Sequence, residues 1–204
     1  RDLHSFPTRR SSDLGSDGET PAPIIGAGIL LYRDAAGTIG GDLASEGNVI
    51  GNSGNWGIIL GGLSGYAEYT VANNRIGIDG SGNPITNTNG GISIGKAQNS
   101  AIMTNTISHN DGPGVQISYS EVVVENNIIE NNNTSGVYVV PNYGADSSPI
   151  SEASSADDSI SSVHISGNSL DGNCADFIGH CAGILGLDDS IDPDAIGEIG
   201  RAHV

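Results

Sequence analysis

Hydrophobic residues recur in short clusters through the middle of the chain. A β-branched residue stands three positions before an Asn at Val71, Ile102, Val124 and Ile165, and an Ile or Leu follows each of those Asn residues by two positions. A second cluster, in which Gly precedes two alternating apolar residues, follows after a polar turn. Strands this short need neighbours to be stable, so the pattern predicts repeated short strands that stack on one another.

Five copies of this pattern can be aligned. The Asn residues are Asn48, Asn74, Asn105, Asn127 and Asn168, and the glycines are Gly57, Gly91, Gly114, Gly136 and Gly183. The uninterrupted copy from Asn105 to Asn127 gives a repeat of 22 residues. A fixed repeat of this length predicts a solenoid. We therefore predict an all-β fold, a right-handed single-stranded parallel β-helix of about five to six coils, with two strands and a turn in each.

Alternation within the second cluster separates an inner face from an outer face. We expect Ile58, Leu60, Ile92, Ile94, Val115, Ile117, Val137 and Val139 to fill the core, and Ile59, Ser93, Gln116 and Tyr138 to face outward. The five Asn residues are expected to form an internal ladder at a left-handed bend, with a structural rather than a ligand-binding role. Leucine-rich repeats fit less well, because the framework here uses Ile and Val with Asn and Gly turns.

Three segments interrupt the repeat and are predicted to be surface insertions: 77–90, 141–162 and 172–182. The two ends also differ from the middle, since Arg1, Arg9, Arg10 and Arg201 lie there among only seven basic residues. Both tails can be back-translated into sequences that resemble sequencing-library adapters. We therefore expect residues 1–14, which should be disordered, and 198–204 to be artefacts. The natural part would then be a fragment, 15–197, with further domains missing at both ends.

The repeated phrases at Thr38–Gly41, Asn48–Ile50 and Asn74–Asp79 resemble those of right-handed parallel β-helix repeat proteins. These are secreted or cell-surface proteins of bacteria in the pectin-lyase-like superfamily, and the resemblance covers about residues 24–187. It implies the fold and an extracellular or cell-surface location. The superfamily includes lyases, hydrolases, epimerases, tailspikes and adhesins, so the resemblance does not select an activity.

Charge narrows the range of partners. The chain has 24 acidic and seven basic residues, for a formal net charge of −17, which disfavours nucleic acid. It has no apolar run long enough to insert into a membrane. The partner expected from the resemblance is a polysaccharide or a cell-surface glycan.

Candidate chemistry is sparse, and we predict no catalytic, cofactor-binding or metal-binding residue. Ca²⁺ is a minor alternative, because Asp79, Ser81 and Asn83 offer oxygens at alternate positions of a turn. Cys174 and Cys181 are the only cysteines and are candidates for a disulfide. Trp56, Arg75 and Tyr138 are weak candidates for glycan contact, because each stands at an outward or turn position.

Two functions remain open from the sequence. The first is a non-catalytic structural, adhesion or glycan-contact module. The second is a polysaccharide lyase, hydrolase or epimerase whose active site is incomplete in this chain. A cluster of carboxylates with Arg, Lys or His on successive coils would favour the enzyme, and the sequence does not assemble one.

Overall fold

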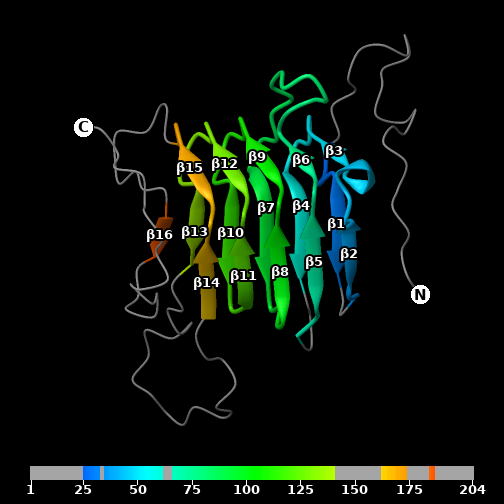
Figure 1. Cartoon of the computed structure of the whole chain (residues 1–204), viewed down its shortest axis with the longest axis vertical. Helices are drawn as coiled ribbons and strands as arrows, with labels where there is room; N and C mark the ends of the chain where they lie inside the picture. Colours follow the sequence, from blue (N-terminus) through cyan, green and yellow to red (C-terminus); the bar gives the residue numbers. More distant parts are fainter. Residues whose placement is uncertain (1–24, 33–34, 62–65, 141–161, 174–183, 187–204) are drawn as a thin grey trace.

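The computed structural model describes residues 25–32, 35–61, 66–140, 162–173 and 184–186. These residues form a right-handed parallel β-helix in which three parallel sheets surround one core (Figure 1). The six-stranded sheet is β1 (Ile29–Tyr32), β4 (Trp56–Gly61), β7 (Gly90–Gly95), β10 (Val115–Ser118), β13 (Val137–Val139) and β16 (Ile184–Gly186). About five coils are present, so the predicted fold class is confirmed.

The other two sheets have five strands each. The second sheet is β2 (Gly37–Gly40), β5 (Tyr69–Ala72), β8 (Ser100–Met103), β11 (Glu121–Glu125) and β14 (Ser162–Ser166). The third sheet is β3 (Val49–Ile50), β6 (Arg75–Ile76), β9 (Thr106–Ser108), β12 (Ile128–Glu130) and β15 (Ser169–Asp171). Each strand pairs in parallel with its counterpart in the next coil, as Val115 does with Ile92 and Val137.

Each coil contains three strands, so the predicted count of two was wrong. The residue before the ladder Asn is left-handed in four coils, at Asn73, Thr104, Asn126 and Gly167 with φ of 59°, 55°, 55° and 63°. One left-handed residue turns the chain sharply, so the run from the β-branched residue to the Ile divides into a strand of the second sheet and a strand of the third. The ladder Asn residues themselves are not left-handed, contrary to expectation.

The predicted ladder runs unbroken through all five Asn residues. The Nδ2 atoms of Asn48, Asn74, Asn105 and Asn127 each donate to the Oδ1 atom of the next Asn in the series at 2.9–3.0 Å, ending at Asn168. The backbone N–H of each donates to the same oxygen. Every rung thereby satisfies buried polar groups that the bend would otherwise leave without partners.

A second ladder, which we did not predict, lies at the next corner. Asn87, Asn110 and Asn132 donate in series through Nδ2, ending at Asn173, with distances of 2.8, 2.8 and 3.1 Å. Ser53 begins the series through its backbone N–H, which donates to Asn87 at 3.2 Å. The signal was present in the sequence, because an Asn follows the ladder Asn by five residues in three of the copies.

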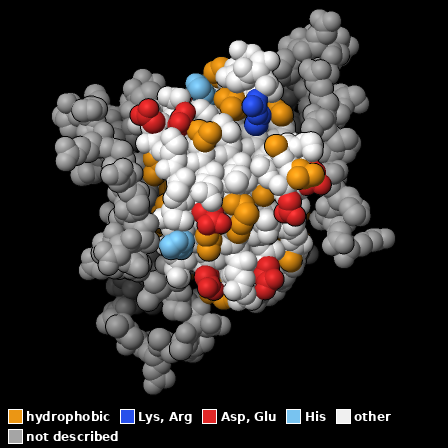
Figure 2. Space-filling model, viewed as in Figure 1, with side chains coloured by type: hydrophobic (Ala, Val, Ile, Leu, Met, Phe, Trp, Pro, Cys, Tyr) orange, Lys and Arg blue, Asp and Glu red, His pale blue; other side chains and the backbone are white. Residues whose placement is uncertain are grey.

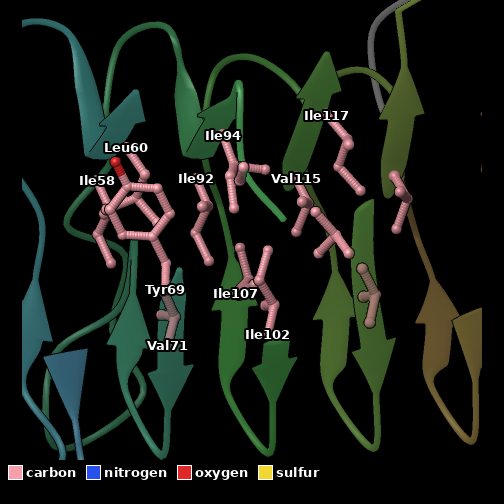
Figure 3. Packing of buried hydrophobic residues seen from close by; sticks show 14 of the residues in the cluster. Ile58, Leu60, Tyr69, Val71, Ile92, Ile94, Ile102, Ile107, Val115 and Ile117 are labelled. Atoms are coloured by element: carbon pink, nitrogen blue, oxygen red, sulfur yellow. The ribbon is translucent and has the colours of Figure 1, made fainter. Parts of the chain in front are cut away.

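The core is a column of Ile, Val and Leu side chains from all three sheets (Figure 3). Ile58, Ile92, Val115 and Val137 are fully buried in it, as the alternation predicted. Gly57, Gly91 and Gly114 are required by this packing, since a Cβ atom on Gly91 would lie 2.6 Å from Ile107 Cγ2. Tyr69 is the largest fully buried side chain.

Two departures from regularity lie within the described coils. In the first coil Ile39 occupies the strand position that Val71 occupies in the second coil. The segment that follows Ile39 includes the 3-10 helix η2 (Ala44–Glu46) and is an insertion that we did not predict. In the second coil the chain leaves the β-helix after Gly77 and returns to it at Ile85, inside the insertion predicted at 77–90. No helix among the described residues is long and apolar enough to cross a membrane.

Several predictions concern residues outside the described part of the chain. These are both tails (1–14 and 198–204), almost all of the insertion at 141–162, most of the insertion at 172–182, the pair Cys174 and Cys181, and Gly183.

Candidate functional site

The outer face of the six-stranded sheet differs from the rest of the described surface because none of its strands contains a charged residue. The acidic residues of the described segments lie on the other two sheets and on the turns, for example Glu121, Glu125 and Glu130. Figure 2 shows acidic side chains spread across the face formed by these other two sheets. A neutral face on a chain of net charge −17 is the most distinctive surface feature of the described residues.

Pairing between strands fixes which side chains are neighbours on this outer face. One outward row contains Leu30, Ile59, Ser93, Gln116 and Tyr138, taken in order from β1 to β13. Leu30 is 58% exposed, and the other four are half-buried. The row therefore begins apolar, becomes hydrogen-bonding at Ser93 and Gln116, and ends on an aromatic ring.

Trp56 is the first residue of β4, at one end of the same sheet. It pairs with Gly90, and a Cβ atom on Gly90 would overlap the indole ring, so the ring lies against this glycine of the next coil. Gly90 has φ of +148°, which other residues rarely adopt. The indole remains half-buried, so part of it faces solvent.

A second outward row contains two glycines. It consists of Tyr32, Gly61, Gly95 and Ser118 in consecutive strands. Tyr32 is 49% exposed. Gly61 and Gly95 leave a strip two strands wide without side chains, bounded by a phenol ring and a hydroxyl group. We call this strip the glycine floor.

The corner beyond the glycine floor carries Lys96 and Tyr119, which directly follow Gly95 and Ser118. Both are left-handed, with φ of 50° and 49°. We did not predict from the sequence that Tyr32, the glycine floor and this corner would lie together. A signal was available, because Gly57–Gly61 and Gly91–Gly95 share a pattern in which glycine closes the strand as well as opening it.

The three predicted glycan contacts do not form one cluster. Trp56 and Tyr138 both belong to the six-stranded sheet but stand on β4 and β13, with β7 and β10 between them. Arg75 lies on β6 of the third sheet. Its Nη1 atom donates to the carbonyl oxygens of Asp79 and Gly80 at 3.3 and 2.6 Å, so its guanidinium group is bound to the adjacent insertion.

The segment considered for Ca²⁺ is occupied by its own hydrogen bonds. One oxygen of Asp79 accepts from the backbone N–H groups of Ser81 and Asn83, both at 2.8 Å, and the other accepts from Asn83 Nδ2 at 2.9 Å. Hydrogen bonding, chiefly from the Asn83 side chain, holds the pKa of Asp79 below its ordinary value. Within the described ranges, no group of three or more His, Cys, Asp or Glu side chains could hold a metal ion.

Comparison with known proteins agrees with this architecture. Residues 23–189 match the family described as the right handed beta helix region. The crystal structure of the periplasmic alginate epimerase AlgG is similar, with a TM-score of 0.56 and 18% sequence identity, over 80% of this chain and 33% of that one. At that identity the likeness shows the fold alone, and this chain spans about a third of the epimerase. No curated protein sequence matches the chain.

Proposed function

Because the chain belongs to the right-handed β-helix family, we propose that it is a non-catalytic structural module that contacts glycans through the outer face of its six-stranded sheet. The fold is shared by proteins of many functions, so the argument has to come from the surface itself. The observation that carries the proposal is the uncharged outer face, on which the exposed ring of Tyr32 and the half-buried ring of Tyr138 stand on either side of hydrogen-bonding side chains.

Sugars present both apolar C–H faces and hydroxyl groups. Aromatic rings pack against the C–H faces, while amide and hydroxyl side chains bond the hydroxyls. Tyr32, Trp56 and Tyr138 provide the rings, and Ser93 and Gln116 lie between β4 and β13 with one amide and one hydroxyl. Strands of a parallel sheet also hold these groups at fixed spacings of about 4.8 Å per strand, which suits a repeating ligand.

The same proposal accounts for the acidic remainder of the surface. A net charge of −17 repels nucleic acid and keeps a secreted protein dispersed. An extracellular, cell-surface or periplasmic location fits a glycan ligand and the periplasmic origin of the similar epimerase. A disulfide between Cys174 and Cys181 would form in such a compartment.

Glycan affinity electrophoresis tests this proposal. The chain is run in gels that contain neutral or anionic polysaccharides, and we expect at least one to retard it. Trp56→Ala and Tyr138→Ala should each weaken the retardation about tenfold, the loss of one ring contact. Arg75→Ala is the matched control on another sheet and should behave as wild type. Absence of retardation in every gel would refute glycan contact.

A second assay addresses catalysis. The chain is incubated with alginate, with pectate and with neutral glycans, with and without Ca²⁺, and unsaturated and reducing ends and the ratio of epimeric uronates are measured. We expect no change in any substrate. Turnover of any of them would replace the non-catalytic assignment with the enzymatic one.

A further inference from the structure

Asn89 is the one Asn of the chain that a glycine follows. Asn side chains are chemically labile, and in an Asn-Gly pair the glycine has no Cβ atom to obstruct attack by its own backbone nitrogen on the Asn side chain. Asn89 is exposed and directly precedes β7. Among the described residues its side chain makes one hydrogen bond, from Nδ2 to Asn55 Oδ1 at 2.8 Å.

The Asn residues of the two ladders are protected from such an attack. Asn105 is 1% exposed, and its Nδ2 atom donates to three oxygen atoms. Its amide is therefore fixed, and the β-branched Thr106 that follows obstructs the approach of the backbone nitrogen. Asn99 is exposed, as Asn89 is, but Ser100 follows it. Asn89 thus differs from the other Asn residues of the described segments, because it combines exposure with a following glycine.

Packing requires the glycine of this pair. Gly90 has φ of +148°, and a Cβ atom there would overlap the Trp56 indole and lie 2.6 Å from Pro113 O. Any other residue at this position would be strained. The labile pair is therefore a consequence of how β7 begins, against Trp56 of the preceding coil.

We infer that Asn89 is a site of spontaneous deamidation, which releases Trp56 from the start of β7. The Gly90 nitrogen bonds to Asn89 Cγ, and the side-chain nitrogen takes up the proton of the Gly90 amide and leaves as ammonia. Water then opens the resulting succinimide at either carbonyl carbon, which yields aspartate or isoaspartate. The net reaction consumes water and releases ammonia, and nothing is oxidised or reduced.

Loss of the amide removes a donor from this junction. Asn55 Oδ1 accepts from Asn89 Nδ2 and from the Trp56 backbone N–H, at 2.8 and 2.9 Å. A carboxylate at position 89 only accepts, so two oxygen atoms would face each other with no hydrogen between them. Asn55 could turn its own NH₂ group toward the carboxylate only by giving up the bond from Trp56. Isoaspartate would also lengthen the backbone directly before Gly90.

Peptide mapping by mass spectrometry tests the modification. The folded chain is incubated for several days at neutral and at mildly alkaline pH, then digested beside an unincubated sample, and isoaspartate is separated from aspartate by chromatography. We expect the mass change from NH₂ to OH at Asn89, faster at the higher pH because the attacking amide nitrogen must be deprotonated. Asn99 and Asn105 should stay unmodified. An intact Asn89 in the folded chain overturns the site, and equal modification at Asn99 overturns its selectivity.

Fluorescence tests the release of the indole, because Trp56 is the only Trp of the chain. Asn89→Asp reproduces one product and should shift the emission to longer wavelength and lower the melting temperature. Thr88→Asp adds the same charge at the neighbouring exposed position and is the matched control, with wild-type emission expected. Asn89→Gln keeps the amide but forms a cyclic imide far more slowly, so its emission should not drift during incubation as that of wild type does. Wild-type emission and melting in Asn89→Asp would overturn the release of Trp56. Neither readout depends on glycan binding.

Discussion

The side-chain amide of Asn105 donates to Oδ1 of Asn127 at 3.0 Å, although the two residues are 22 positions apart. The same amide also donates to the carbonyl oxygens of Val71 and Met103 at 2.8 and 3.0 Å. One buried side chain therefore joins three successive coils. Its Oδ1 atom completes the set by accepting from Asn74 in the preceding coil.

Replacement of Asn105 by Ala should destabilise the chain strongly. The change removes these buried bonds, including the one that the Asn74 backbone N–H donates to Asn105 Oδ1 and the one that the Val71 carbonyl accepts from Asn105 Nδ2. Each buried polar group left unsatisfied costs about 1–3 kcal/mol, so we expect a loss of about 2–5 kcal/mol in the free energy of unfolding. Chemical denaturation measures it. Thr106→Ala, at the half-buried outward position next to it, is the control and should change little.

Replacement of Thr104 should instead stabilise the chain. Thr104 is an exposed β-branched residue held at φ of 55°, where the neighbouring coils have Asn73, Asn126 and Gly167. Residues with a β-branched side chain tolerate this conformation poorly, whereas Gly and Asn adopt it readily. Thr104→Asn should therefore stabilise the chain by about 0.5–1 kcal/mol. The reciprocal change Asn126→Thr should destabilise it by a similar amount. Equal melting temperatures for all three proteins would show that the bend carries no such strain.

Thr104 also shows why the sequence predicted two strands per coil instead of three. The prediction treated the run from Ile102 to Ile107 as one strand, because Thr is a residue of strands rather than of left-handed bends. In the structure Thr104 holds this bend beside the ladder, with its backbone N–H donating to Glu125 O at 3.2 Å and its hydroxyl donating to Met103 O at 2.7 Å. The inner face, in contrast, was predictable from the sequence, because burial follows alternation directly and Ile58, Ile92, Val115 and Val137 obey it.

The candidate site was less predictable for a related reason. Tyr138 could be placed outside from alternation alone, but its neighbour Gln116 follows only from the strand register. Gly61 and Gly95 could be read as repeat glycines like any others until the pairing set them side by side on the outer face. Neutrality of a face is likewise a property of three-dimensional stacking, since charged residues lie between its strands in the sequence.

The insertion around Asp79 should respond to acid. The pKa of the Asp79 carboxyl group is below the ordinary 3.8, chiefly because the Asn83 side chain donates a hydrogen bond to it. These hydrogen bonds therefore stabilise the folded loop at pH values above the pKa of Asp79 in the unfolded chain. That stabilisation is lost as the pH falls through the lowered, folded pKa. Titration of the Asp79 carboxyl group by NMR should give a midpoint below 3.8, together with changes at the Ser81 and Asn83 amides. Asn83→Ala should raise the midpoint toward 3.8, and a midpoint already at that value in wild type would contradict the hydrogen-bonded loop.

Two glycine substitutions on the six-stranded sheet should differ sharply in stability. In Gly90→Ala the new methyl group overlaps the indole of Trp56 and lies 2.6 Å from Pro113 O, at a backbone φ of +148°. Overpacking and backbone strain of this kind should cost about 2–4 kcal/mol in the free energy of unfolding. In Gly61→Ala the methyl group has no neighbour closer than 3.8 Å among the described residues, so the change should stay within about 0.5 kcal/mol. Denaturant unfolding of both variants tests this difference, because a comparable loss at Gly61 would mean that the fold itself requires glycine there.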